Sequence, residues 1–192
     1  MGSARHCPIG VDFGAESLKM VQLARQDSQV HVVAAGRRQV PDNLAADPAG
    51  RARFFADAIR ELLAKHPFKG KRVVTSIPAE SLFVQPVRMA KMAEPDLVKA
   101  LPWEAQGKLP FPVRDAVLRH LVAGDVFVDN ETRSEVIIMA APRAAVESHL
   151  AAIARAKLDV QAVLVPPLAV IEAFRFLFTR FILNLLRSAI IL

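Results

Sequence analysis

Three apolar runs joined by short turns open the chain, and they restrict its fold more than any other feature. Ile9, Val11 and Phe13 lie two positions apart in the first run. The three runs read "PIGVDF", "SLKMVQLA" and "QVHVVAAGRRQV". Alternation of this kind, with Gly14 or a polar cluster between the runs, predicts consecutive β-strands joined by tight turns.

A helix with clear start signals follows the three strands. We expect Asp47 to cap this helix and Pro48 to occupy its first turn. Phe55 and Ile59 then begin a series of apolar residues at helical spacing, which predicts one buried stripe. The run "KRVVTSIP" after the helix is typical of a short buried strand. The first block is therefore expected to be a sheet packed against a helix.

Residues 81–160 form a second block in which strands and helices are mixed. A strand is expected first, then a helix that Pro102 should kink or split, then two strands and a helix that begins at Pro142. This order predicts a small sheet with two helices on one face. We expect Trp103 to be buried between helix and sheet, with a partner-facing aromatic as the alternative. The two blocks together predict an α/β or α+β architecture.

Composition excludes several classes of protein. Hydrophobic residues make up 53% of the 192 residues, which suffices for a core and excludes general disorder. Cys7 is the single cysteine, so no internal disulfide forms, and the absence of a visible signal peptide predicts a cytoplasmic location. The net charge is +6, but the cations are scattered, and no nucleic-acid partner is expected.

The turn between the first two strands contains four residues suited to phosphate chemistry. Gly14 lets backbone N–H groups approach a phosphate, Ser17 brings a hydroxyl donor, and Lys19 brings a positive charge. Asp12 at the strand end is suited to hold the water shell of a Mg²⁺ ion. The spacing is not that of a Walker A loop. Taken alone, the pattern is also typical of an ordinary tight turn.

Several short stretches in the same order resemble known families. The stretch "IGVDFGAESLKMVQL" resembles the first phosphate loop of the actin-like ATPases. The stretches "VVTSIPAESLFVQPVRM", "WEAQGKLPFPVRDAVL" and "LDVQAVLVPPLAVIEAF" resemble the PilM family of type IV pilus assembly proteins, cytoplasmic relatives of the cell-division protein FtsA. The resemblance covers roughly residues 8–174 and is carried by the order of the matches.

The resemblance implies a fold and a set of ligands. Residues 8–80 and 161–175 would form the actin-like, ribonuclease-H-like subdomain 1A, and residues 81–160 the inserted α+β subdomain 1C. By the same resemblance, the chain would bind ATP with Mg²⁺ and hold the cytoplasmic segment of the inner-membrane protein PilN. The cofactor-binding residues carried over are Asp12, Gly14, Ser17 and Lys19, with Asp12 near the metal through water.

The sequence also departs from the actin-like pattern. Nucleotide sites of that superfamily lie between two domains and use a second phosphate loop and a glycine pair from the second half. No further D-x-G turn follows Glu172, and Gly124 is the last glycine. We therefore expect only the N-terminal half of such a protein, with the second domain missing and ATP binding weak or absent. No catalytic residue is predicted.

Residues 176–192 are an apolar tail with a distinct composition. Arg180, Asn184 and Arg187 share one narrow stripe of a helical wheel, which is typical of an amphipathic helix at a membrane surface. The arginines make a membrane span costly, at about 2.5–3.5 kcal/mol for each one at the centre of the bilayer. The two other interpretations are a truncated or frameshifted end and a helix packed on a protein core.

Three functions are compatible with the pattern. The first is a cytoplasmic scaffold of type IV pilus assembly, at the inner-membrane face, that recruits a PilN-like membrane partner through its cytoplasmic peptide. Such a peptide is expected to pair with a sheet edge or to lie in a groove between the subdomains. The second is an ATP-binding protein of the FtsA type with a membrane-associating tail, and the third is a truncated remnant without activity. The incomplete nucleotide site favours the scaffold.

Overall fold

The described residues form two sheets, of six and three strands. The computed structural model describes residues 4–27, 29–44, 47–167, 169–171 and 173–175. In the larger sheet, β3 pairs antiparallel with β1, β2 and β4, whereas β5 pairs parallel with β2 and β9. Its strands are β1 (Arg5–His6), β2 (Ile9–Phe13), β3 (Ser17–Gln26), β4 (Gln29–Gln39), β5 (Arg72–Ser76) and β9 (Asp159–Leu164). The three predicted opening strands are confirmed as β2, β3 and β4.

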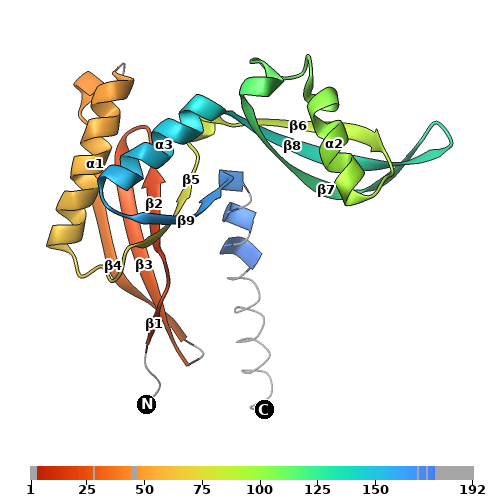
Figure 1. The fold of residues 1–192 in the computed structure, drawn as a ribbon. Helices are drawn as coiled ribbons and strands as arrows, with labels where there is room; N and C mark the ends of the chain where they lie inside the picture. The colour runs from red at the N-terminus through yellow and green to blue at the C-terminus, as the bar shows by residue number, and fades with distance from the viewer. Residues whose placement is uncertain (1–3, 28, 45–46, 168, 172, 176–192) are drawn as a thin grey trace, which may run out of the picture.

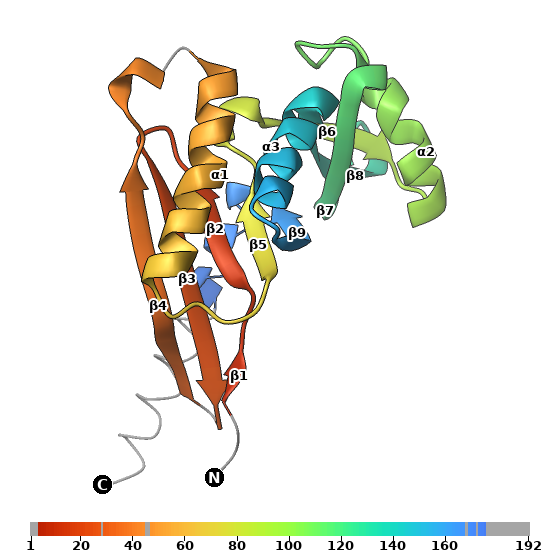
Figure 2. The ribbon, with the colours of Figure 1, turned by 60° about the vertical axis from the view of Figure 1, so that its left-hand side comes forward.

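Two helices cover one face of this sheet. The helices α1 (Pro48–Lys65) and α3 (Arg143–Arg155) pack against each other over the sheet (Figure 1 and Figure 2). The start of α1 is as predicted, because the side chain of Asp47 accepts a hydrogen bond from the backbone N–H of Gly50 at 2.9 Å and proline occupies the first turn. The core lies between the helices and the sheet. Its largest fully buried side chains include Ile9 and Leu18 from the strands and Ile59 and Ile153 from the helices.

A smaller sheet with its own core lies beside the first (Figure 1). Its strand order is β6 (Phe83–Ala90), β8 (Glu131–Pro142) and β7 (Ala116–Val128), and all pairs are antiparallel. The helix α2 (Glu94–Ala105) covers one face, with Leu97 and Leu101 packed on Val136 and Ile138. Short 3₁₀ turns lie at Asp42–Leu44, Ala79–Ser81 and Val113–Asp115. The predicted α/β architecture is confirmed.

The second helix of the 81–160 block does not lie where the sequence pattern placed it. We predicted two helices on the small sheet, but Ala152, Ile153 and Ala156 of α3 belong to the core of the larger sheet. The strand β9 also pairs with β5 of that sheet. The apolar face of α3 is thus buried by α1 and the large sheet. On this packing, we draw the boundary between the blocks at the junction of β8 and α3 instead of at residue 160.

For α2, a split at Pro102 and a buried Trp103 are both contradicted by the structure, whereas a kink at Pro102 stays a prediction. Pro102 does not split α2, because it lies near the C-terminal end of the helix, which continues to Ala105. Trp103 is 76% exposed instead of buried. The buried stripe of α2 runs through Leu97, Leu101 and Ala105, and a residue two positions after Leu101 points about 200° away from that stripe. The partner-facing alternative for Trp103 therefore remains open.

The end of the chain is described in part. Residues 166–167, 169–171 and 173–175 are helical, which agrees with the helix start predicted after β9. Residues 176–192, on which the tail prediction falls, lie outside the described residues. Within the part of the chain that the structure describes, no helix has the length and apolar character needed to cross a membrane.

Candidate functional site

The predicted phosphate turn is the hairpin between β2 and β3. The backbone N–H of Gly14 donates to the carbonyl oxygen of Ser17 at 3.1 Å, which closes the turn. A Cβ atom at position 14 would lie 2.9 Å from that carbonyl oxygen, closer than real Cβ contacts allow. The hairpin itself therefore requires glycine at this position, whether or not a ligand binds.

The four predicted residues do not all meet at one surface. Asp12 and Lys19 are cross-strand partners, and their Oδ2 and Nζ atoms form an ion pair at 3.2 Å with both side chains about half exposed. Ser17 is only 2% exposed, so its hydroxyl lies in the interior. These residues fit the predicted ATP–Mg²⁺ corner only in part, since the carboxylate and the ammonium neutralise each other. The binding of ATP with Mg²⁺ stays a prediction.

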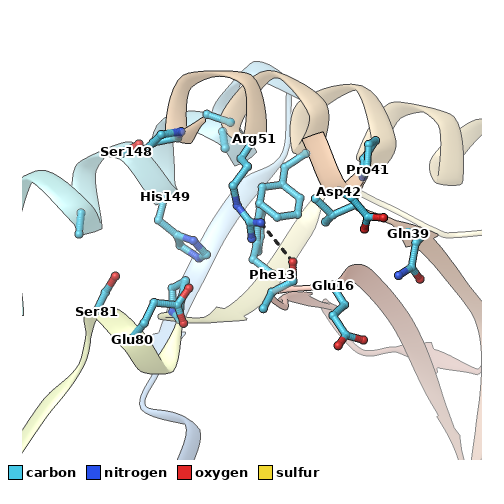
Figure 3. Close-up of a pocket in the computed structure, with 18 residues that line it drawn as sticks. Phe13, Glu16, Gln39, Pro41, Asp42, Arg51, Glu80, Ser81, Ser148 and His149 are labelled. Atoms are coloured by element: carbon cyan, nitrogen blue, oxygen red, sulfur yellow. Dashed lines mark hydrogen bonds between the residues drawn. The ribbon is translucent and has the colours of Figure 1, made fainter. Parts of the chain in front are cut away.

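A cavity of about 710 Å³ lies on the other face of the same hairpin, under α1 and α3 (Figure 3). Residues from several separate segments line it. They come from the end of β2 and its turn, the end of β4 and the 3₁₀ turn that follows, the first turns of α1, the 3₁₀ turn Ala79–Ser81, and α3. The cavity is thus adjacent to the segment that leads from the large sheet to the small one.

Three buried rings form the inner wall of the cavity. The ring of Phe13 packs edge-on against Phe55, with centroids 4.9 Å apart, and against His149, with centroids 4.4 Å apart. Each of the three residues is less than a tenth exposed. Edge-to-face packing holds the rings in fixed orientations. The inner wall is therefore a rigid, largely apolar surface.

His149 is held by a hydrogen-bond chain that fixes its tautomer. The hydroxyl of Thr75 donates to the carbonyl oxygen of Val11 at 2.9 Å, and Thr75 Oγ1 lies 3.0 Å from His149 Nε2. Because that hydroxyl has one proton, Nε2 carries the hydrogen and donates to Oγ1. Burial lowers the pKa of His149 from 6.5 to about 4. The ring is therefore neutral near pH 7, with Nδ1 as a hydrogen-bond acceptor.

The rim of the cavity is acidic. Glu16, Asp42 and Glu80 line it with exposed side chains, and within the described residues no ion pair or side-chain hydrogen bond of theirs is found. Arg51 also lines the cavity, but its guanidinium donates to the carbonyl oxygen of Ala15 at 3.1 Å and lies over the ring of Phe55. The cation is thus held by the turn and an aromatic ring, and it forms no ion pair with these carboxylates among the described side chains.

Comparison with known families decides the ancestry of the chain. A family model described as "Type IV pilus assembly protein PilM" matches residues 10–191. The chain belongs to the PilM family. The resemblance seen in the short sequence stretches is therefore confirmed over nearly the whole chain.

Solved structures place this PilM-family chain in the same fold group. It is similar to a "PilM-PilN type IV pilus biogenesis complex", with a TM-score of 0.72 and 26% identity over 83% of this chain. It is also similar in fold to the cytoplasmic domain of EpsL, an inner-membrane component of the type II secretion system of Vibrio cholerae, with a TM-score of 0.54 and 20% identity over 85% of this chain. The chain spans 47% and 57% of the lengths of these two structures.

Sequence reasoning missed the cavity of this PilM-family chain. Within the described residues, no group of three or more His, Cys, Asp or Glu is placed to hold a metal ion. One signal was present in the sequence. Ala145, Ser148 and Ala152 surround His149 at helical spacing, and small side chains on one helix face leave room beside a polar ring.

Proposed function

We propose that this PilM-family chain is an assembly scaffold at the cytoplasmic face of the inner membrane. In this proposal, the cavity under α1 and α3 holds a cytoplasmic peptide of a PilN-like membrane partner. The observation that carries the proposal is the cavity itself, with a rigid wall of Phe13, Phe55 and His149 and an open polar rim. Its volume of about 710 Å³ is sufficient for several side chains of an extended peptide.

The position of the cavity supports a scaffold. Its lining includes Glu80 and Ser81, which lie in the connection between the two sheets, and residues of α3, which follows the small sheet. A peptide bound there would contact both segments that join the sheets, so binding would favour one arrangement of the two blocks. Of the two modes expected from the sequence, the groove is therefore favoured over pairing with a sheet edge.

The comparisons support the class of partner. The solved relative with 26% identity is named as a complex of PilM with PilN, and its similarity extends over 83% of this chain. We infer a PilN-like partner for this chain on that basis. Association of residues 176–192 with a membrane surface stays a prediction, because those residues lie outside the described part.

A bulky side chain in the cavity tests the proposal. Ala145 lines the cavity from α3, and its neighbour Ala144 is exposed and does not line it. We expect Ala145→Trp to weaken binding by about tenfold or more, because the indole would occupy the space of the ligand. The matched control Ala144→Trp is expected to change the affinity by less than about twofold.

The measurement is fluorescence anisotropy with a labelled synthetic peptide. The peptide is the cytoplasmic N-terminal segment of the PilN-like protein from the same organism, added to the full chain. Circular dichroism of both tryptophan variants confirms that they are folded. The proposal is wrong if the wild-type chain does not bind this peptide, or if Ala145→Trp binds it as tightly as Ala144→Trp does.

A further inference from the structure

The charge of the cavity indicates what kind of peptide it fits. Three carboxylates, those of Glu16, Asp42 and Glu80, lie on the rim without a partner among the described side chains. The guanidinium of Arg51 donates to backbone oxygens of the β2–β3 turn at 3.1 and 3.4 Å, and among the described side chains it forms no ion pair with these carboxylates, so the lining carries three acids against one base. The rim is therefore complementary to a cation and repels an acidic segment.

A buried acceptor adds a second, independent requirement. His149 is 8% exposed, and it projects from α3 into the cavity between Glu80 and Phe13 (Figure 3). Its Nε2–H donates to Thr75, so Nδ1 offers a lone pair and no proton. The bond of Nε2 to Thr75 fixes the neutral ring with Nδ1 as a free acceptor. A ligand that presents an N–H or O–H group to Nδ1 is therefore favoured.

The apolar wall adds a third requirement. Phe13 and Phe55 present ring atoms to the cavity beside His149. Burial of an apolar side chain against this wall is favourable because the side chain leaves water. A charged group is stabilised only at the rim, beside the carboxylates. The ligand therefore needs apolar and cationic groups within a few residues of each other.

We propose that the cavity selects an extended peptide segment in which a positively charged side chain adjoins an apolar one, with His149 Nδ1 accepting a hydrogen bond from the segment. This inference rests on the proposed function and specifies its ligand. The apolar side chain packs on Phe13 and Phe55, and the cation lies at the carboxylate rim. Cytoplasmic segments of membrane proteins near the bilayer are rich in Lys and Arg, so a membrane partner's peptide has this character.

Neutralising the rim tests the charge requirement. In the triple variant Glu16→Gln/Asp42→Asn/Glu80→Gln, we expect the partner peptide to bind about tenfold more weakly than to wild type, with less dependence on salt. The same peptide with its Lys and Arg replaced by Gln is expected to bind both proteins equally. A control triple variant changes the net charge by the same amount on the small sheet and α2, through Asp96→Asn, Glu104→Gln and Glu131→Gln.

Replacing His149 by glutamine tests the acceptor. The amide of His149→Gln can still donate to Thr75 from the place of Nε2, but it has no acceptor at the place of Nδ1. We expect binding of the peptide to weaken by about fivefold. In wild type, the ¹⁵N resonance of Nδ1 should move upfield when the peptide is added, which a merely structural role would not cause. The control His31→Gln replaces an exposed histidine that does not line the cavity.

The outcomes separate this inference from the function on which it rests. Equal affinities of the rim and control triple variants, or an Nδ1 resonance unchanged by bound peptide, would overturn the inference and leave the peptide site intact. Absence of any binding to wild type would overturn the proposed function as well. Selective loss of binding in the rim variant, together with the Nδ1 shift, supports both.

Discussion

Replacing Ile153 by alanine is expected to lower the free energy of unfolding by about 3 kcal/mol. Ile153 is fully buried, and it lies on α3 in the core of the larger sheet. Its removal leaves a cavity between α3 and that sheet in addition to the lost burial of apolar surface. Urea unfolding followed by circular dichroism measures the effect, with the midpoint shifted and the slope unchanged.

The control for this prediction is Val98→Ala. Val98 is 49% exposed on α2, and its truncation should change the stability by less than about 0.5 kcal/mol. The assignment of α3 to the larger sheet would be wrong if Ile153→Ala unfolded with the stability of wild type. The assignment would also be wrong if Ile153→Ala lowered the stability of the small sheet alone and left the unfolding of the larger sheet unchanged.

Acidification is expected to destabilise the protein through His149. Burial lowers the pKa of this histidine to about 4, whereas its ordinary value in an unfolded chain is 6.5. Between these values the unfolded chain binds a proton that the folded chain does not, so stability falls as the pH falls from the unfolded pKa towards the folded one. The loss attributable to His149 is about 2 kcal/mol between about pH 7.5 and about pH 5.

Unfolding by urea at several pH values measures this loss, and His149→Gln separates it from the titration of carboxylates. Glutamine does not titrate, so the variant should lose about 2 kcal/mol less than wild type over the same range. If the free energy of unfolding depended on pH in the same way in wild type and variant, the claim that His149 is buried and neutral in the folded protein would be refuted. Above about pH 7 both profiles should be flat with respect to this group, because His149 is then neutral in both states.

The parts of the fold set by local signals were predictable from the sequence. Asp47 and Pro48 define the start of α1 through a side-chain cap and a fixed φ, which depend only on neighbouring residues. The turn at Gly14 is local in the same way, since the glycine closes on a carbonyl three residues away. The order of strands and helices followed from such signals, and so did the family resemblance.

The packing of α3 was not predictable in this way. The apolar stripe of α3 shows that one face is buried, but it contains no information on which sheet buries that face. The chain places Ile153 on the large sheet because β9, directly after α3, pairs with β5. Trp103 is a different kind of error, because the helical period from Leu101 already indicated an exposed position.

The cavity was missed because it exists only in three dimensions. Its wall and rim come from segments as distant in the chain as Phe13, Glu80 and His149. Each residue alone has an ordinary structural interpretation, and only the fold brings Glu80, which has no ion-pair partner among the described side chains, to the same cavity as the buried imidazole of His149. The predicted turn residues, by contrast, were adjacent in sequence, yet the fold separates Ser17 from the exposed pair of Asp12 and Lys19.

Site-directed cross-linking tests most directly the claim that the cavity is the peptide site. Ser148 lines the cavity from α3, so Ser148→Cys in a Cys7→Ser background places a thiol at its edge. The partner's N-terminal peptide carries a bromoacetyl group, and mass spectrometry detects the adduct. We expect rapid modification of Ser148→Cys that excess unlabelled peptide suppresses, and only slow modification of the control Lys99→Cys on α2. Equal rates at both positions, or a rate that unlabelled peptide does not change, would contradict the account.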